Sequence, residues 1–141
     1  MTLPALTIDR VRAYPPRMTA FTSRFWNSLS AGQFETSHCR SCDRLSFPPK
    51  PICPHCWSSD IGWSPLSGRG RLYSSTVIHA APAVFQPEAP YSVGIVDLDE
   101  GLRIATRIVG ETTPALDSAV ELVVLRYTDG PLYGVRVQED V

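Results

Sequence analysis

The residues best suited to chemistry in this sequence are four cysteines arranged as two pairs. Cys39 and Cys42 form one Cys-x-x-Cys pair, ten residues follow, and Cys53 and Cys56 form the second pair. Two such knuckles joined by a short hairpin bring four thiolates to one tetrahedral point, which suits Zn²⁺ with Zn–S distances near ~2.3 Å. Because all four cysteines of the chain belong to this pattern, it predicts a four-cysteine zinc ribbon.

Two other interpretations of the cysteine site remain open from the residues alone. Iron fits the same tetrahedron of thiolates, as it does in rubredoxin-like sites. A dithiol redox site is the third interpretation, although it needs one pair that opens a helix rather than two pairs on a ribbon. A four-cysteine site is coordinatively closed, so its expected role is structural: the metal folds a segment that is too small to have its own core.

The three histidines do not complete a catalytic constellation. His38 and His55 lie inside the cysteine motif, as spare ligands or as ribbon surface, and His79 ends an expected strand. For His79, a solvent-facing strand residue is the favoured interpretation over a general base. The sequence contains no nucleophile elbow, phosphate-binding loop or HExxH helix. It therefore predicts a protein that is not an enzyme by itself.

The segment before the cysteines is expected to hold an arm and one short amphipathic helix. Residues 1–18 contain three prolines and little periodicity, which is typical of an arm. From about Thr19 to Ala31, apolar residues recur on one helical face, and Gly32 is the expected stop. These residues are Phe21, Phe25 and Leu29, flanked by Trp26. The aromatic stripe packs either against this protein, which is favoured, or against a partner.

The rest of the chain has the pattern of a small β-barrel. Five strand-like segments follow the turn Ser67-Gly68-Arg69-Gly70, with a longer connector between the third and the fourth. Their count and order favour a closed OB-type barrel over an open sandwich, which usually needs about seven strands. The expected strands are Arg71–His79, Tyr91–Asp97, Leu102–Val109, Val120–Thr128 and Leu132–Gln138.

These elements predict a mainly β fold in three parts. The N-terminal arm and amphipathic helix occupy 1–36, the four-cysteine zinc ribbon occupies 37–66, and the five-stranded OB-fold barrel occupies 67–141. The segment 80–90, between the first two strands, is expected to be a stiff and partly apolar loop, because it contains three prolines and Phe85.

Composition and charge limit the classes of protein to which this chain can belong. Of the 141 residues, 43% are hydrophobic and 19% are charged, which excludes wholesale disorder. The net charge of −1 hides a split: nine basic and four acidic residues up to Arg71 give +5, whereas four basic and ten acidic residues after it give −6. No secretion-type apolar run and no stretch of ~18 apolar residues is present, so we expect a cytoplasmic protein without a membrane partner.

Several motifs follow one another in an order typical of a known family. They are Phe25-Trp26-x-x-Leu29-x-x-Gly32-Gln33-Phe34, the cysteine pairs around Phe47-Pro48-Pro49-Lys50, Ser67-Gly68-Arg69-Gly70 with Tyr73-Ser74-Ser75-Thr76-Val77, and Pro90-Tyr91 continuing to Val96-Asp97-Leu98-Asp99-Glu100-Gly101. On these motifs the chain resembles the domain-of-unknown-function family number thirty-five, from about Thr19 to Val137. The cysteine pairs alone are unspecific, whereas their combination with the last stretch is specific.

The resemblance implies an N-terminal helical part, a rubredoxin-like zinc ribbon and an acyl-CoA-associated OB fold. It also implies a non-catalytic accessory subunit of a thiolase-superfamily enzyme, such as a thiolase, an aldolase or an acyltransferase. Such a subunit assists the binding or channelling of acyl-CoA and forms a hetero-oligomer with the enzyme.

With CoA as a ligand, its phosphates need cations, and its acyl or pantetheine chain needs an apolar surface. The cationic candidates are Arg44, Lys50, Arg69 and Arg71, and the apolar candidates for contact with CoA or a partner are Phe25, Trp26 and Phe85. Ordinary solvated surface is the competing interpretation of the cations. Members of the family commonly carry arginine where this chain has Lys50, which weakens the case for bidentate phosphate recognition there.

Two other classes of function compete with this one. OB barrels and zinc ribbons also bind nucleic acids, but such a barrel needs a basic groove with stacking aromatics, and the barrel half carries −6. Arg103 and Arg107 share one expected strand face, which leaves a local basic patch. A stand-alone thioesterase or hydratase is the third class, and no acid–base pair supports it. The charge of the barrel half therefore does not favour nucleic acid as a partner.

Overall fold

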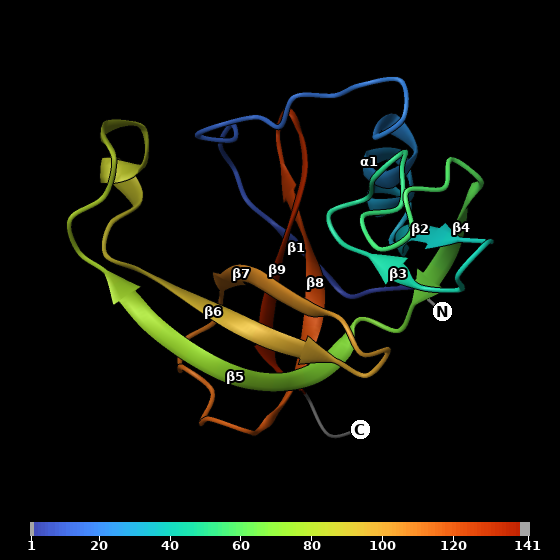
Figure 1. Cartoon of the computed structure of the whole chain (residues 1–141). Coiled ribbons are helices and arrows are strands. Elements are labelled where there is room, and N and C mark those ends of the chain that lie inside the picture. Colours follow the sequence, from blue (N-terminus) through green and yellow to red (C-terminus); the bar gives the residue numbers. More distant parts are fainter. Residues whose placement is uncertain (1, 139–141) are drawn as a thin grey trace.

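The computed structural model describes residues 2–138. The first residue of the expected segment 1–36 and the last three residues of the expected segment 67–141 therefore lie outside the described residues. Within the described residues the chain is mostly β-structure (Figure 1). In chain order the elements are β1 (Ala5–Thr7), α1 (Ser23–Ser30), β2 (Phe34–Cys39), β3 (Leu45–Ser46), β4 (Ile61–Leu66), β5 (Arg69–Ile78), the 3-10 helix η1 (Ala83–Glu88), β6 (Tyr91–Leu98), β7 (Arg103–Ile108), β8 (Ala119–Tyr127) and β9 (Gly130–Val137).

Five strands close into a barrel. β5 pairs with β6, β6 with β7, β7 with β9, and β9 with β8, which returns to β5. All these pairings are antiparallel except the short parallel contact between β7 and β9. The mainly β class and the five-stranded OB-type barrel expected from the sequence are confirmed. Each expected strand is present, with ends that differ by at most two residues.

The barrel interior is filled by apolar residues from facing strands. On β7, Ile104, Thr106 and Ile108 are buried, and Val96 of β6 lies opposite Ile104. On the other side of the barrel, β8 is buried on both faces, since Leu122, Val123, Val124 and Leu125 are all buried. Alternation with a period of two thus fills the interior from β7, whereas β8 also packs its second face against Leu6 and Ile8 of the arm.

The arm contains a strand that the sequence analysis did not predict. β9 pairs along β8 from Val120 to Tyr127, so the remaining edge of β8 is shared by two other strands. β5 takes the first part of that edge, and β1 takes the second part in parallel, with Leu6 opposite Leu125. The barrel sheet therefore has six strands, and the arm is part of it.

The helix is shorter at its start than expected. Thr19 and Thr22 exchange hydrogen bonds between their side chains and backbone N–H groups, which makes a turn before α1 begins at Ser23. At the other end, Gly32 adopts φ +82°, and its N–H and that of Gln33 donate to the carbonyls of Leu29 and Ser28. This is the glycine-ended C-terminus that the sequence predicted.

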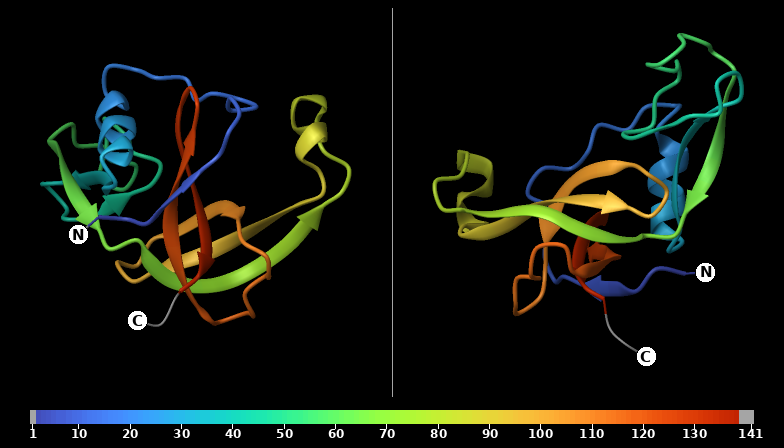
Figure 2. Two further views of the ribbon diagram at one scale, coloured as in Figure 1. Left: turned by 180° about the vertical axis from the view of Figure 1, so that it is seen from behind. Right: turned by 60° about the horizontal axis from the view of Figure 1, so that its bottom comes forward.

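The ribbon is a three-stranded sheet with the order β3-β2-β4. It begins at Phe34, before the expected boundary at residue 37. Phe34 packs against Phe25 of α1, Phe47 of the ribbon and Tyr133 of β9, with ring centroids 5.5–5.6 Å away. This aromatic cluster joins the helix, the ribbon and the barrel, and Figures 1 and 2 show the helix lying between the ribbon and the barrel strands.

The expected loop 80–90 contains η1, which lies on the opposite side of the barrel from the ribbon (Figure 2). The basic arm reaches both η1 and the β8–β9 turn. Arg10 lies 3.4 Å from Glu88, and Arg12 lies 3.4 Å from Asp129. Part of the charge split between the two halves is therefore used inside the molecule, where arginines of the arm meet acids of the barrel half.

Candidate metal centre and apolar pocket

The two cysteine knuckles have the same backbone hydrogen bonds. The N–H of Asp43 donates to the carbonyl of Cys39, and the N–H of Trp57 donates to that of Cys53, at 2.8 and 2.9 Å. In each knuckle the residue after the second cysteine, Asp43 or Trp57, has φ of +66°. Each turn thus reverses the chain, so that the two thiols of a knuckle face the same point.

The four thiols form one cluster. Their Sγ atoms lie within 4.8 Å of one another, with 3.5 Å between Cys39 and Cys56 and 3.6 Å between Cys42 and Cys53. A tetrahedron with Zn–S bonds of ~2.3 Å has edges of about 3.8 Å, so the cluster has the size that Zn²⁺ needs. None of the four forms a disulfide. The donor set and its spacing therefore fit a structural zinc ion.

Backbone N–H groups support the cluster from outside. The N–H of Cys42 points at Cys39 Sγ, and that of His55 points at Cys53 Sγ, both at 3.4 Å. The N–H of Cys42 is the main reason that the pKa of the Cys39 thiol is lowered to about 6. A lowered pKa favours the thiolate, which is the form that binds metal.

The two histidines of the motif are not part of the metal cluster. His38 Nε2 lies 2.6 Å from a carboxylate oxygen of Asp43, and His55 Nδ1 lies 3.3 Å from a guanidinium nitrogen of Arg44. Of the two interpretations that the sequence left open, ribbon surface is therefore the one that agrees with their contacts.

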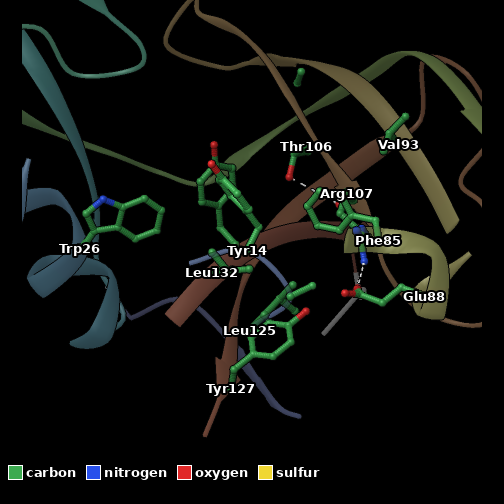
Figure 3. Close-up of a pocket in the computed structure, with 13 residues that line it drawn as sticks. Tyr14, Trp26, Phe85, Glu88, Val93, Thr106, Arg107, Leu125, Tyr127 and Leu132 are labelled. Carbon is green, nitrogen blue, oxygen red and sulfur yellow. Dashed lines mark hydrogen bonds and ion pairs between the residues drawn. The ribbon is translucent and has the colours of Figure 1, made fainter. Parts of the chain in front are cut away.

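An apolar pocket of about 540 Å³ lies on the outer face of the barrel, between α1, the arm and η1. Five of its 13 lining residues are aromatic: Tyr14, Trp26, Phe85, Tyr127 and Tyr133. In the view of Figure 3, Trp26 and Phe85 lie at opposite ends, with Tyr14 and Leu132 between them. The structure thus brings together two residues that the sequence analysis named separately.

The third apolar candidate, Phe25, lies elsewhere. Its side chain is 3% exposed, and its ring contacts Trp26, Phe34, Phe47 and Tyr133. Phe25 is therefore a core residue and cannot offer its ring to CoA or a partner in this conformation. Of the two roles considered for the aromatic stripe, packing within the protein is the one that Phe25 and Leu29 fulfil.

The four cationic candidates do not line the apolar pocket. Arg44 borders a separate polar cavity of about 410 Å³, together with Asp43, His55 and Glu100. Arg71 donates to the carbonyl of Asp117, and Lys50 and Arg69 lie on the ribbon and at the start of β5. The structure therefore separates the cations from the aromatic pocket, which no motif in the sequence pointed to.

Comparison with known proteins gives two matching family models. The rubredoxin-like zinc ribbon domain of ChsH2 matches residues 26–62, and the C-terminal OB-fold domain of ChsH2 matches residues 63–125. A chain of the solved structure described as "Ltp2-ChsH2(DUF35) aldolase" superposes with a TM-score of 0.75 and 30% identity, over 87% of this chain and 98% of that one. A DUF35 protein of unknown function from Sulfolobus solfataricus, at 16% identity and a TM-score of 0.59, shares the fold.

Three curated relatives are similar in sequence. A DUF35 domain-containing scaffold protein of Methanothermobacter thermautotrophicus is 36% identical over 65% of this chain and 71% of its own length. Another of Methanocaldococcus jannaschii is 40% identical, over 50% of this chain and 51% of its own length. The benzoylsuccinyl-CoA thiolase subunit BbsA of Thauera aromatica is 39% identical, over 61% of this chain and 59% of its own length.

This chain spans less than two thirds of the length of the first curated relatives that it matches, from 31% to 59%. The two family models place a zinc ribbon before an OB-fold domain, in the order in which the structure has the ribbon and the barrel. The chain therefore belongs to the DUF35 family, with a zinc ribbon and an OB-fold domain of the ChsH2 type.

Proposed function

We propose that this protein is a non-catalytic accessory subunit of a thiolase-superfamily enzyme, with which it forms a hetero-oligomer. The observation that carries the proposal is the superposition on 98% of a chain from an aldolase structure whose description includes DUF35. The names of two further relatives, a benzoylsuccinyl-CoA thiolase subunit and a probable enoyl-CoA hydratase alpha subunit from Thermomonospora curvata, add support because both refer to subunits that act with acyl-CoA enzymes.

The role of this subunit is to assist the binding or channelling of acyl-CoA. Four cations, Arg44, Lys50, Arg69 and Arg71, have no carboxylate within ion-pair distance among the described residues. Their charges remain available for the phosphates of CoA, unlike those of Arg24 and Arg40, which pair with Glu35 and Asp60. Phosphate contacts need such uncompensated cations, so the four residues remain the candidates for this part of the ligand.

The alternative of a nucleic-acid-binding module has weaker support. Its local basic patch depended on Arg103 and Arg107, and both are paired with carboxylates, Arg103 with Asp97 and Arg107 with Glu88. A steep dependence of affinity for single-stranded DNA on salt concentration would favour this alternative.

The test is affinity purification of the tagged full chain from its native host, followed by identification of the bound proteins. We expect a thiolase-superfamily enzyme to be retained through washes at moderate salt. The control is the tagged variant Cys53→Ser, which lacks one of the four metal ligands. It shows whether retention of the enzyme needs a correctly folded chain. Recovery of nucleic-acid-binding proteins alone, or turnover of acyl-CoA by the purified chain alone, would contradict the proposal.

The same experiment bears on where the protein works. Within residues 2–138 none of the helices has the length and apolar character needed to cross a bilayer. A cytoplasmic location stays a prediction, and recovery of a cytoplasmic acyl-CoA enzyme would support it.

A further inference from the structure

The charges at the apolar pocket neutralise one another. Arg107 and Glu88 are the charged side chains of its lining, and the guanidinium of Arg107 donates to a carboxylate oxygen of Glu88. The Glu88 side chain is 8% exposed and also lies 3.4 Å from Arg10. On the other side, the guanidinium of Arg107 lies 4.0 Å from the ring centroid of Tyr91. Neither charge is free to meet a phosphate, and a charged ligand group buried here would lack a partner.

The shape and the walls of the pocket favour a rigid apolar ligand. A volume of about 540 Å³ is in the range of small-molecule sites, and the pocket is open to solvent. Aromatic faces from the arm, α1, η1 and the β8–β9 hairpin surround it. A ring system fills such a space with less loss of conformational freedom than a linear chain of the same size.

The walls are held in place before any ligand binds. Arg12 ties the arm to the β8–β9 turn, because its backbone N–H and its guanidinium donate to the side chain and the carbonyl of Asp129, both at 2.8 Å. Glu88 ties η1 to β7 and to the arm. Trp26 is set by its edge-to-face contact with Phe25, at 4.9 Å between ring centroids. A preformed pocket of this kind favours a ligand that matches it without rearrangement.

We propose that this pocket binds the acyl group of an acyl-CoA, and that it selects acyl groups that are apolar and contain rings. The CoA nucleotide lies outside the pocket, because neither charged side chain of the lining is free to meet a phosphate. This inference rests on the proposed function and adds to it the class of substrate and the place of its acyl part.

Isothermal titration calorimetry of the full zinc-loaded chain tests the inference with three probes. They are 2-naphthoyl-pantetheine, which has the ring but no nucleotide, 2-naphthoyl-CoA, and acetyl-CoA, which has the nucleotide but almost no acyl group. We expect 2-naphthoyl-pantetheine to bind, and 2-naphthoyl-CoA to bind at least about tenfold more tightly than acetyl-CoA, because a buried ring contributes more than one tenfold step in affinity.

A matched pair of variants locates the binding. Ala105→Phe fills the pocket from β7, where Ala105 is exposed and lines the wall, so the barrel core is untouched. Ala119→Phe makes the same change at an exposed strand position outside the pocket. We expect the affinity for 2-naphthoyl-pantetheine to fall roughly tenfold or more in A105F and to stay within about twofold in A119F.

Three results would overturn the inference. The first is equal affinity for 2-naphthoyl-CoA and acetyl-CoA, and the second is an affinity for 2-naphthoyl-pantetheine that A105F leaves unchanged. The third is loss of the co-purified enzyme in A105F while 2-naphthoyl-pantetheine still binds, which would make the pocket a protein-docking site. Failure of the unaltered chain to retain any enzyme would instead contradict the proposed function. The two failures can be told apart, because the calorimetry measures binding of the probes without the enzyme.

Discussion

The ring of Phe34, in the first ribbon strand, lies 5.6 Å from the ring of Tyr133, in the last barrel strand. Both rings also contact Phe25 and Phe47, so helix, ribbon and barrel share one aromatic cluster. Burial raises the pKa of the Tyr133 phenol to about 12. The ribbon is therefore held against the barrel by packing as well as by the chain that joins them.

Replacement of Phe34 by alanine tests this shared cluster. The side chain is 2% exposed, so its loss leaves a cavity between ribbon and barrel. We expect Phe34→Ala to lower the free energy of unfolding by about 3–5 kcal/mol, as for other buried aromatic residues. Chemical denaturation of the zinc-loaded chain, followed by fluorescence and by circular dichroism, measures the loss.

The matched control is Leu116→Ala, because Leu116 is 63% exposed in the connector before β8. We expect it to change the free energy of unfolding by less than about 0.5 kcal/mol. Equal effects of the two substitutions would show that the Phe34 ring does not hold the ribbon to the barrel.

The second prediction concerns the metal. Cys53 is 1% exposed and supplies one of four clustered thiols, so Cys53→Ser removes a ligand that no neighbouring group can replace. We expect elemental analysis to find about one zinc per wild-type chain and a large loss in C53S, together with unfolding of the ribbon. His55→Ala is the control and should keep its zinc, because the His55 ring faces Arg44. Wild-type protein with neither zinc nor iron in stoichiometric amount would refute the metal site.

The metal site and the barrel strands were predictable because their signals are local. Two Cys-x-x-Cys pairs specify the ligands by spacing alone, and alternation along β7 specifies its buried face over only six residues. The strand β1 left no such signal, because it has three residues and is held by backbone pairing with β8. Phe25 and Phe21 share a helical period in sequence, but Phe21 lies before the start of α1 and contacts Trp63 with tilted rings.

The apolar pocket could not be predicted for a different reason. Its walls come from segments as far apart as Tyr14 and Tyr133, and no motif links these segments to one another. The sequence did indicate Trp26 and Phe85 as candidates for contact with a ligand or partner, from their chemistry, but it could not place them around one cavity. Only the closure of the barrel and the return of the arm over it bring these residues together.

The third prediction is a pH dependence of the contact between the arm and the barrel. The backbone N–H of Arg12 donates to the Asp129 carboxylate, and this bond, with the nearby guanidinium, lowers the pKa of Asp129. A carboxyl with a lower pKa in the folded state stabilises that state at neutral pH. Its contribution is lost as the pH falls below the unfolded value of about 3.9 and through the lower folded value.

We therefore expect Asp129→Asn to be less stable than wild type at pH 7, and the difference to shrink as the pH falls below about 4. Thermal unfolding at a series of pH values measures it. Asp99→Asn, at an exposed turn, is the control and should run parallel to wild type at every pH. A D129N deficit that grows on acidification would have the wrong sign and would reject this account.

The last prediction concerns the carboxylate that holds η1. Glu88→Gln keeps the shape of the side chain but removes the charge that Arg10 and Arg107 share. Hydrogen bonds to charged groups contribute about 1.5–3 kcal/mol, so local opening of η1 becomes easier by a similar amount. Hydrogen exchange of the Phe85 and Ala89 amides, which close the turns of η1, should accelerate at least about tenfold. Asp97→Asn breaks the exposed pair with Arg103 on the same sheet and should leave these two amides unchanged. If both variants accelerate exchange equally, general loosening of the sheet is the cause and Glu88 does not fix the wall of the pocket.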